Sequence, residues 1–169
     1  MKIIYLDLDG VLNNTEYYQK KDLSSHHKEH SHFDIKNISA LNKIVKNTDA
    51  KVVLSSAWRL IKTVEETNLL FKEVGINAEV ISATESLHYK DTYELAPRGL
   101  EILKWIRDYH RTLKGGLENY VIIDDEDDIL DIQEKHFFHI NDVVGLTDQN
   151  ADVIIEFLNS YTIPKLELP

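Results

Sequence analysis

The stretch YLDLDGVLNN, residues 5–14, joins the end of a hydrophobic segment to two closely spaced carboxylates. Residues 3–6 (IIYL) have the apolar character of a buried strand. Because side chains along a strand alternate between its two faces, Asp7 and Asp9 are expected to point the same way. Neighbouring carboxylates repel each other, which raises the free-energy cost of ionising both. Asp9 followed by Gly10 would also suit a tight turn, so this stretch must be read together with the rest of the chain.

The composition is that of an ordinary globular protein. The chain has 169 residues and is 43% hydrophobic, which suits one domain, residues 1–169, with a sizeable core. It contains no cysteine, which excludes disulfides and thiolate metal sites and fits a reducing, cytoplasmic setting. A net charge of −10 works against a broad footprint on duplex DNA and is compatible with divalent cations. No apolar run approaches membrane-spanning length and the N-terminus has no signal-peptide pattern, so we expect no membrane partner.

Segments of strand character alternate with amphipathic segments along the chain. Strands are predicted at 2–7, 51–56, 78–82, 119–124 and 136–140, and helices at 34–47, 57–74, 97–113 and about 148–160. Gly75 is expected to end the second helix as its C′ residue. Strands that alternate with helices predict right-handed crossovers and an α/β fold with a parallel sheet of about five strands, covered by helices on both faces.

Residues 13–33 interrupt this pattern with a long polar segment that has no clear period. Loops of this length within a domain are usually functional or mobile, so we expect a flap or a small lid. Four histidines cluster there, namely His26, His27, His30 and His32. They are compatible with a solvated flap, which is the favoured interpretation, or with a transition-metal site.

Polar side chains follow three of the predicted strands. The three sets are Asp7 with Asp9, Ser55 with Ser56, and Asp124 with Asp125, the last followed by Asp127 and Asp128. Each set alone would serve as a turn or a helix cap. Ligands of open α/β sheets bind at the carboxyl ends of the strands where the strand order reverses, so the sets converge if the second and fourth strands flank the first. Carboxylates crowded at one edge need a cation, and oxygen ligands without His or Cys indicate Mg²⁺.

On these motifs the sequence resembles the haloacid dehalogenase-like (HAD) superfamily of phosphohydrolases. The first motif is YLDLDGVL (5–12), the second is VVLSS (52–56) and the fourth is VIIDDEDD (121–128). Two further stretches, LSSAWR (54–59) and PRGLEILKWI (97–106), resemble the HAD domains linked to RNA-repair proteins. The resemblance implies a single Rossmann-like HAD core. The chain has no insertion large enough for a separate cap domain, so the site is expected to be open.

The resemblance also implies the roles of the carboxylates. Asp7 would be the nucleophile that forms an aspartyl-phosphate, and Asp9 would be the general acid and then the general base. Mg²⁺ would be held by the Asp7 carboxylate, the Asp9 backbone carbonyl and Asp124, with Asp125 or Asp128 completing its ligands. In this interpretation two like acids perform different tasks because their environments differ.

The phosphate site implied by the resemblance includes Ser55, whose hydroxyl would hydrogen-bond the phosphoryl group, with Ser56 and Gly10 beside it. The family also uses a cation near the start of the helix before the fourth strand. Arg98 fits this position, because it lies in the first helical turn, where the macrodipole disfavours a positive charge. Lys90 is the alternative cation.

Arg59 is compatible with two roles, contact with the substrate phosphate or an ion pair with a neighbouring carboxylate.

The favoured function is that of a Mg²⁺-dependent phosphatase acting on phosphate monoesters, on either a phosphorylated small molecule or a nucleic-acid end. An open site and aromatic residues such as Trp58 and Tyr18 favour a nucleotide or nucleic-acid end phosphate. The alternatives are a small-metabolite phosphatase of the same fold, a nucleotide-sugar transferase, and a non-catalytic phosphate- or metal-binding domain. The sequence gives no oligomeric state.

Overall fold

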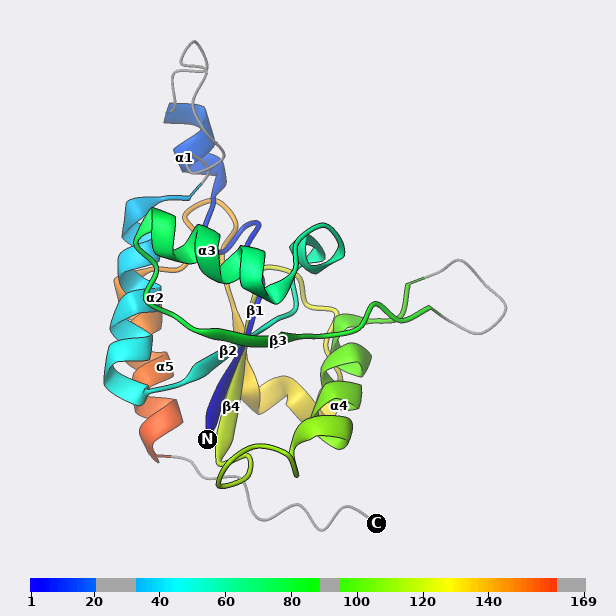
Figure 1. The fold of residues 1–169 in the computed structure, drawn as a ribbon. Helices are drawn as coiled ribbons and strands as arrows, with labels where there is room; N and C mark the ends of the chain where they lie inside the picture. Colours follow the sequence, from blue (N-terminus) through cyan, green and yellow to red (C-terminus); the bar gives the residue numbers. More distant parts are fainter. Residues whose placement is uncertain (21–32, 89–94, 161–169) are drawn as a thin grey trace.

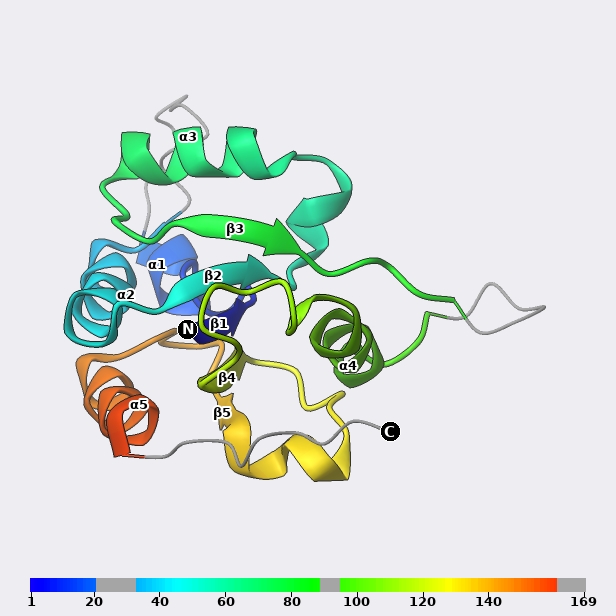
Figure 2. The ribbon, with the colours of Figure 1, turned by 60° about the horizontal axis from the view of Figure 1, so that its bottom comes forward.

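Five parallel strands form one sheet in the order β3-β2-β1-β4-β5 (Figure 1; β5 is labelled in Figure 2). The computed structural model describes residues 1–20, 33–88 and 95–160. The strands are β1 (Lys2–Leu6), β2 (Lys51–Leu54), β3 (Val80–Ala83), β4 (Asn119–Asp124) and β5 (Phe137–His139). Because β1 lies between β2 and β4, the strand order reverses at β1, and the sequence condition for convergence of the three polar sets is met.

Helices cover both faces of this sheet (Figure 2). The helical elements are α1 (Thr15–Lys20), α2 (Ile35–Thr48), η2 (Ala57–Leu60), α3 (Val64–Val74), α4 (Arg98–Tyr109), η3 (Asp131–His136) and α5 (Asp148–Ser160). Strand alternation divides the core: Ile4 and Leu6 pack in the cluster that includes α2, α3 and α5, whereas Ile3 and Tyr5 pack in the cluster that includes α4. The predicted α/β class, with a parallel five-stranded sheet between helices, is confirmed.

The helix predicted over 57–74 is in fact two elements. Ser56 Oγ accepts a hydrogen bond from Trp58 N at 3.5 Å and begins the short η2 turn. The α-helix starts only after Thr63, which forms a capping box with Glu66. Two N-caps therefore compete along this stretch, and the second one sets the start of α3. Gly75 ends the helix with a positive φ of 83°, as predicted.

The polar segment 13–33 contains the short helix α1, which the sequence did not predict. Asn14 fixes its start, because its Oδ1 accepts from Tyr17 N at 2.8 Å and its Nδ2 donates to Asn37 Oδ1 at 2.6 Å. Several residues named in the sequence analysis lie outside the described residues, namely His26, His27, His30, His32 and Lys90. In the described ranges there is no large cap domain, and no helix there has the length and apolar character needed to span a bilayer.

Candidate active site

The strand register aligns three polar positions at one edge of the sheet. Leu6 of β1 is the partner of Leu54 in β2 and of Ile123 in β4, so the next residue on each strand lies at the same level. These next residues are Asp7, Ser55 and Asp124. Backbone hydrogen bonds continue the register past the strand ends, because Asp7 N donates to Ile123 O at 3.0 Å and Ser55 N donates to Leu6 O at 3.0 Å.

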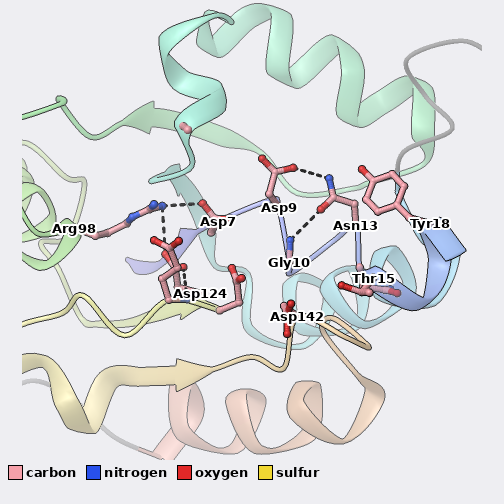
Figure 3. Close-up of a pocket in the computed structure, with 13 residues that line it drawn as sticks. Asp7, Asp9, Gly10, Asn13, Thr15, Tyr18, Arg98, Asp124 and Asp142 are labelled. Carbon is pink, nitrogen blue, oxygen red and sulfur yellow. Dashed lines mark hydrogen bonds and ion pairs between the residues drawn. The ribbon is translucent and has the colours of Figure 1, made fainter. Parts of the chain in front are cut away.

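Arg98 reaches into this edge from the first turn of α4. Its Nη1 donates to Asp7 Oδ1 at 2.7 Å and to the Ser55 carbonyl at 2.7 Å, and it lies 3.3 Å from Asp124 Oδ2 (Figure 3). The contact with Asp124 is an ion pair without hydrogen-bond geometry, and Asp124 Oδ2 is a buried oxygen with no hydrogen-bond partner in the described residues. One guanidinium group therefore pairs with two carboxylates, and it donates a hydrogen bond to Asp7 but not to Asp124.

Burial changes the proton affinity of these groups. Burial raises the pKa of Asp7 to about 6 and that of Asp124 to about 7, although the Arg98 guanidinium opposes both shifts. Burial acts on Arg98 to lower its pKa, but the carboxylates of Asp124 and Asp7 outweigh it, and the pKa is raised overall. Burial also raises the pKa of Asp125. Burial thus makes ionisation of these carboxylates less favourable than in water, and a cation beside them would oppose that shift.

Asp125 completes a cluster with Asp7 and Asp124, in which each residue offers a carboxylate oxygen within 4.8 Å of the others. Gly10 permits the close approach of Asp125. Its φ is +73°, and a Cβ built on it would lie 2.3 Å from the Asp125 carboxyl carbon. No other residue fits that position without displacing a member of the cluster. Asp128 lies elsewhere: its Oδ2 accepts from Arg98 N at 3.0 Å and caps the start of α4.

Asp9 is exposed and stands apart from this cluster. Its Oδ1 accepts from Asn13 Nδ2 at 2.7 Å, and its Oδ2 accepts from Trp58 Nε1 at 2.9 Å. Asn13 is oriented in turn by its Oδ1, which accepts from Gly10 N at 3.0 Å. In Figure 3 the Asp9 side chain points toward Asn13 and away from Asp7. The sequence did not single out Asn13, and its only signal was its place just after the first motif.

The two serines after β2 differ in their surroundings. Ser55 Oγ is buried and has no hydrogen-bond partner among the described residues, so it has a donor available for a ligand. Ser56 Oγ caps η2, as the cap reading of this position predicted. Ser55 lies at the level of the cluster, but it is fully buried, and neither serine is among the described residues that line the pocket over the cluster. Its contact with phosphate stays a prediction.

Arg59 takes the second of its two predicted roles. It pairs with Glu101, with Nη2 2.6 Å from Oε2, and its Nη1 donates to the Ser55 carbonyl. Arg59 therefore lies beside the site without lining it. The carboxylate that neutralises Arg59 is thus that of Glu101.

A pocket of about 340 Å³ opens over the cluster (Figure 3). Besides the predicted residues Asp7, Asp9, Gly10, Arg98, Asp124 and Asp125, it is lined by Asn13, Asn14, Thr15, Tyr18, Ala57, Glu126 and Asp142. Most of the additional residues come from the segment after the first motif, where polar residues without a period gave no signal of a shared surface.

The chain was compared with known proteins by family, by curated relatives and by solved structures. A family model described as the HAD domain in Swiss Army Knife RNA repair proteins matches residues 3–151. The chain belongs to this family. The HAD resemblance and its link to RNA-repair proteins are thereby confirmed, and membership supports an HAD-type phosphohydrolase at the level of reaction class. Neither the curated proteins nor the solved structures returned a match.

Proposed function

We propose that this HAD domain is a Mg²⁺-dependent phosphatase that hydrolyses phosphate monoesters through an aspartyl-phosphate on Asp7. The observation that carries the proposal is the cluster of Asp7, Asp124 and Asp125, with the partly buried Arg98 in contact with the first two. A purely structural cluster would have a cation for each buried carboxylate, since unpaired buried charge is costly.

The residues present fit a metal ion. The cluster offers only oxygen ligands, which suit Mg²⁺, and it includes the buried Oδ2 of Asp124, which has no hydrogen-bond partner among the described residues. Asp7, Asp124 and Asp125 would hold the ion, with the Asp9 backbone carbonyl as a further ligand. Bound there, Mg²⁺ would neutralise the carboxylates and polarise a phosphoryl oxygen.

Asp7 acts as the nucleophile in this proposal. Arg98 engages Asp7 Oδ1, so Oδ2 is the oxygen that we assign to attack on phosphorus. The new bond joins Asp7 to phosphorus while the ester oxygen leaves and takes a proton from Asp9. Water then attacks the phosphoryl group, gives a proton back to Asp9, and releases Asp7 and inorganic phosphate. The Ser55 hydroxyl and the Arg98 guanidinium hold the phosphoryl oxygens.

Asp9 must move during this cycle. Both of its oxygens accept from donor groups, Asn13 Nδ2 and Trp58 Nε1, in the position that it occupies here. Delivering a proton to a leaving group requires Asp9 to release at least one of them and turn toward Asp7. Proton transfer by a positioned acid contributes about 10²–10⁴-fold to the rate.

For the substrate, we propose the terminal phosphate of a nucleotide or of a nucleic-acid end. Three observations support it: the family description refers to RNA repair proteins, the described residues include no large cap, and Tyr18 lies at the pocket lining with 40% of its surface exposed. The net charge of −10 limits contact to a few nucleotides. Stacking on an aromatic ring contributes about 1–3 kcal/mol per base.

The test compares kcat/KM for a 3′- or 5′-phosphorylated oligonucleotide, a mononucleotide and a sugar phosphate, each at two salt concentrations with Mg²⁺. We expect the nucleotide substrates to be preferred, with a shallow salt dependence of about 0.7 log units per phosphate contact for each tenfold change in salt. A preference of about tenfold or more for the sugar phosphate, near 1.4 kcal/mol, would replace this substrate with a small metabolite. If the protein hydrolyses none of these phosphate esters in the presence of Mg²⁺, the alternative of a non-catalytic binding domain replaces the proposed function.

A further inference from the structure

A second buried ion pair lies next to the site. Arg59 of η2 and Glu101 of α4 have 8% and 4% of their side-chain surfaces exposed, and their closest charged atoms are 2.6 Å apart. Neither residue lines the pocket. Desolvating two charges is costly, and a pair of well-packed apolar side chains often serves stability equally well. The pair therefore calls for an account beyond stability.

The pair meets the site at a single atom, the carbonyl oxygen of Ser55. Arg59 Nη1 donates to this oxygen, and so does Arg98 Nη1 at 2.7 Å. The same Nη1 of Arg98 donates to Asp7 Oδ1 at 2.7 Å. Contacts thus run without a break from Glu101 through Arg59 and the Ser55 carbonyl to the Arg98 guanidinium, which faces the proposed nucleophile.

Glu101 uses both carboxylate oxygens. Oε2 binds Arg59, and Oε1 accepts from Leu87 N at 3.0 Å. Leu87 O accepts in turn from Ala96 N at 2.9 Å, which joins the segment after β3 to the segment before α4. Because Glu101 is on α4, the helix that begins with Arg98, its contacts connect η2 and the segment after β3 to the helix that carries the proposed phosphate-binding cation.

We propose that Arg59 and Glu101 are positioning residues for Arg98, an inference that rests on the proposed function. Arg59 fixes the Ser55 carbonyl, and this carbonyl directs Arg98 toward Asp7. Glu101 neutralises Arg59, so that the second guanidinium does not compete with Arg98 for Asp7 and Asp124. A long arginine side chain held by a fixed acceptor loses less freedom when phosphate binds.

The experiment measures binding of inorganic phosphate by calorimetry with saturating Mg²⁺, in a double-mutant cycle of Arg59→Lys and Arg98→Ala. Lysine keeps the charge opposite Glu101 but lacks the second group that reaches the Ser55 carbonyl. We expect Arg59→Lys to weaken phosphate binding about tenfold in the wild-type background and less than about twofold with Arg98→Ala. The same variant should raise KM for para-nitrophenyl phosphate more than it lowers kcat, which a general loss of structure would not do.

Two further variants separate positioning from folding. Lys104 also connects α4 to the segment after β3, through Glu85 at 3.0 Å, but at the surface and without contact to Ser55. Lys104→Met is therefore the matched control and should leave phosphate binding unchanged. If Arg59→Lys does not fold, the combined Arg59→Met and Glu101→Leu variant replaces the pair with apolar side chains and should still bind phosphate about tenfold more weakly.

Equal losses from Arg59→Lys with and without Arg98 would overturn the positioning role, as would unaltered binding in the wild-type background. These results leave the proposed function intact, provided that the wild type binds phosphate and Arg98→Ala weakens it. If the wild type binds no phosphate in the presence of Mg²⁺, the proposed function and this inference both fail.

Discussion

Two partly buried arginines, Arg59 and Arg98, donate to the same carbonyl oxygen, that of Ser55, yet their surroundings differ. Arg59 has one carboxylate partner, Glu101, and both oxygens of that carboxylate have donors. Arg98 has two carboxylate partners, Asp7 and Asp124, and one oxygen of Asp124 has no donor in the described residues. The first arrangement is balanced in charge and gives both carboxylate oxygens a donor, although Arg59 Nε has no hydrogen-bond partner among the described residues. The second arrangement has two carboxylates for one guanidinium.

The imbalance of charge is the reason to assign Arg98 and its carboxylates, and not the Arg59–Glu101 pair, to the proposed binding site. Among the described residues, six carboxylates line the pocket and Arg98 is the only cation that does so. The carboxylates are those of Asp7, Asp9, Asp124, Asp125, Glu126 and Asp142. Such an excess of negative charge is unfavourable in the metal-free protein. A divalent cation bound by Asp7, Asp124 and Asp125 would, together with Arg98, offset the charge of these three carboxylates and reduce the excess in the pocket. The phosphate of a substrate would then contact both cations. The balanced pair, Arg59 with Glu101, has no excess charge for a ligand to neutralise. Its contact with the Ser55 carbonyl fits the proposed role of positioning Arg98.

The largest effect is expected at the centre of the unbalanced arrangement. Asp7→Asn should lower kcat for para-nitrophenyl phosphate by on the order of 10⁴-fold or more, because an amide is a poor nucleophile. The folded state should survive, since asparagine retains an acceptor for Arg98. A thermal melt serves as the control. Activity near that of the wild type in a preparation free of contaminating phosphatase would remove Asp7 from its role.

The position of the site was largely predictable from the sequence, because it depends on local patterns. Asp7, Ser55 and Asp124 each follow an apolar strand, and the parallel order of the strands places such ends together. Arg98 was predicted from the resemblance, which implies a cation near the start of this helix, and its unfavourable position in a first helical turn supported that choice. These features need only the chain direction and the order of elements.

Other features depend on contacts between distant parts of the chain. Arg59 was compatible with a phosphate contact or an ion pair, and only the packing of η2 on α4 brings it to Glu101. The helix break before α3 arose from competition between the caps Ser56 and Thr63, which local propensity does not resolve. Asp128 matched the metal motif in sequence but caps α4 in the structure.

The next effect concerns the balanced pair. Glu101→Leu should lower the free energy of unfolding by about 3 kcal/mol or more, because it leaves the Arg59 charge buried without a partner. Adding Arg59→Met should restore most of this loss, since apolar side chains then replace both charges. Chemical denaturation of the single and double variants measures both effects. A double variant as unstable as the single one would show that the pair supports the fold directly.

The unbalanced arrangement should respond in the opposite direction. Asp124→Asn should stabilise the metal-free protein by about 1–3 kcal/mol near pH 8, because it removes a buried carboxylate that has an unsatisfied oxygen. The same change should abolish the gain in melting temperature that Mg²⁺ gives the wild type. Calorimetry should find weaker Mg²⁺ binding in this variant than in Ser55→Ala. Wild-type Mg²⁺ affinity in Asp124→Asn would exclude Asp124 from the metal ligands.

The smallest effect follows from the pKa shifts. Burial raises the pKa of Asp7 to about 6 and that of Asp124 to about 7, above their values in the unfolded chain. A raised pKa means that the folded state binds protons more tightly, so these groups favour folding at low pH and lose that contribution as pH rises through about 6 to 7. The stabilisation from Asp124→Asn in the metal-free protein should therefore grow between pH 5 and pH 8.

The affinity for Mg²⁺ should increase as pH rises, because the ion competes with protons for the same carboxylates. Its affinity for the wild type should fall by about tenfold or more between pH 8 and pH 5.5, with protons released on binding. Calorimetry in buffers of different ionisation enthalpy measures that release. Glu101→Gln offers the comparison, since the balanced pair lies outside the metal cluster, and it should retain the same pH dependence. A flat pH dependence of Mg²⁺ affinity in the wild type would mean that the ion binds away from Asp7 and Asp124.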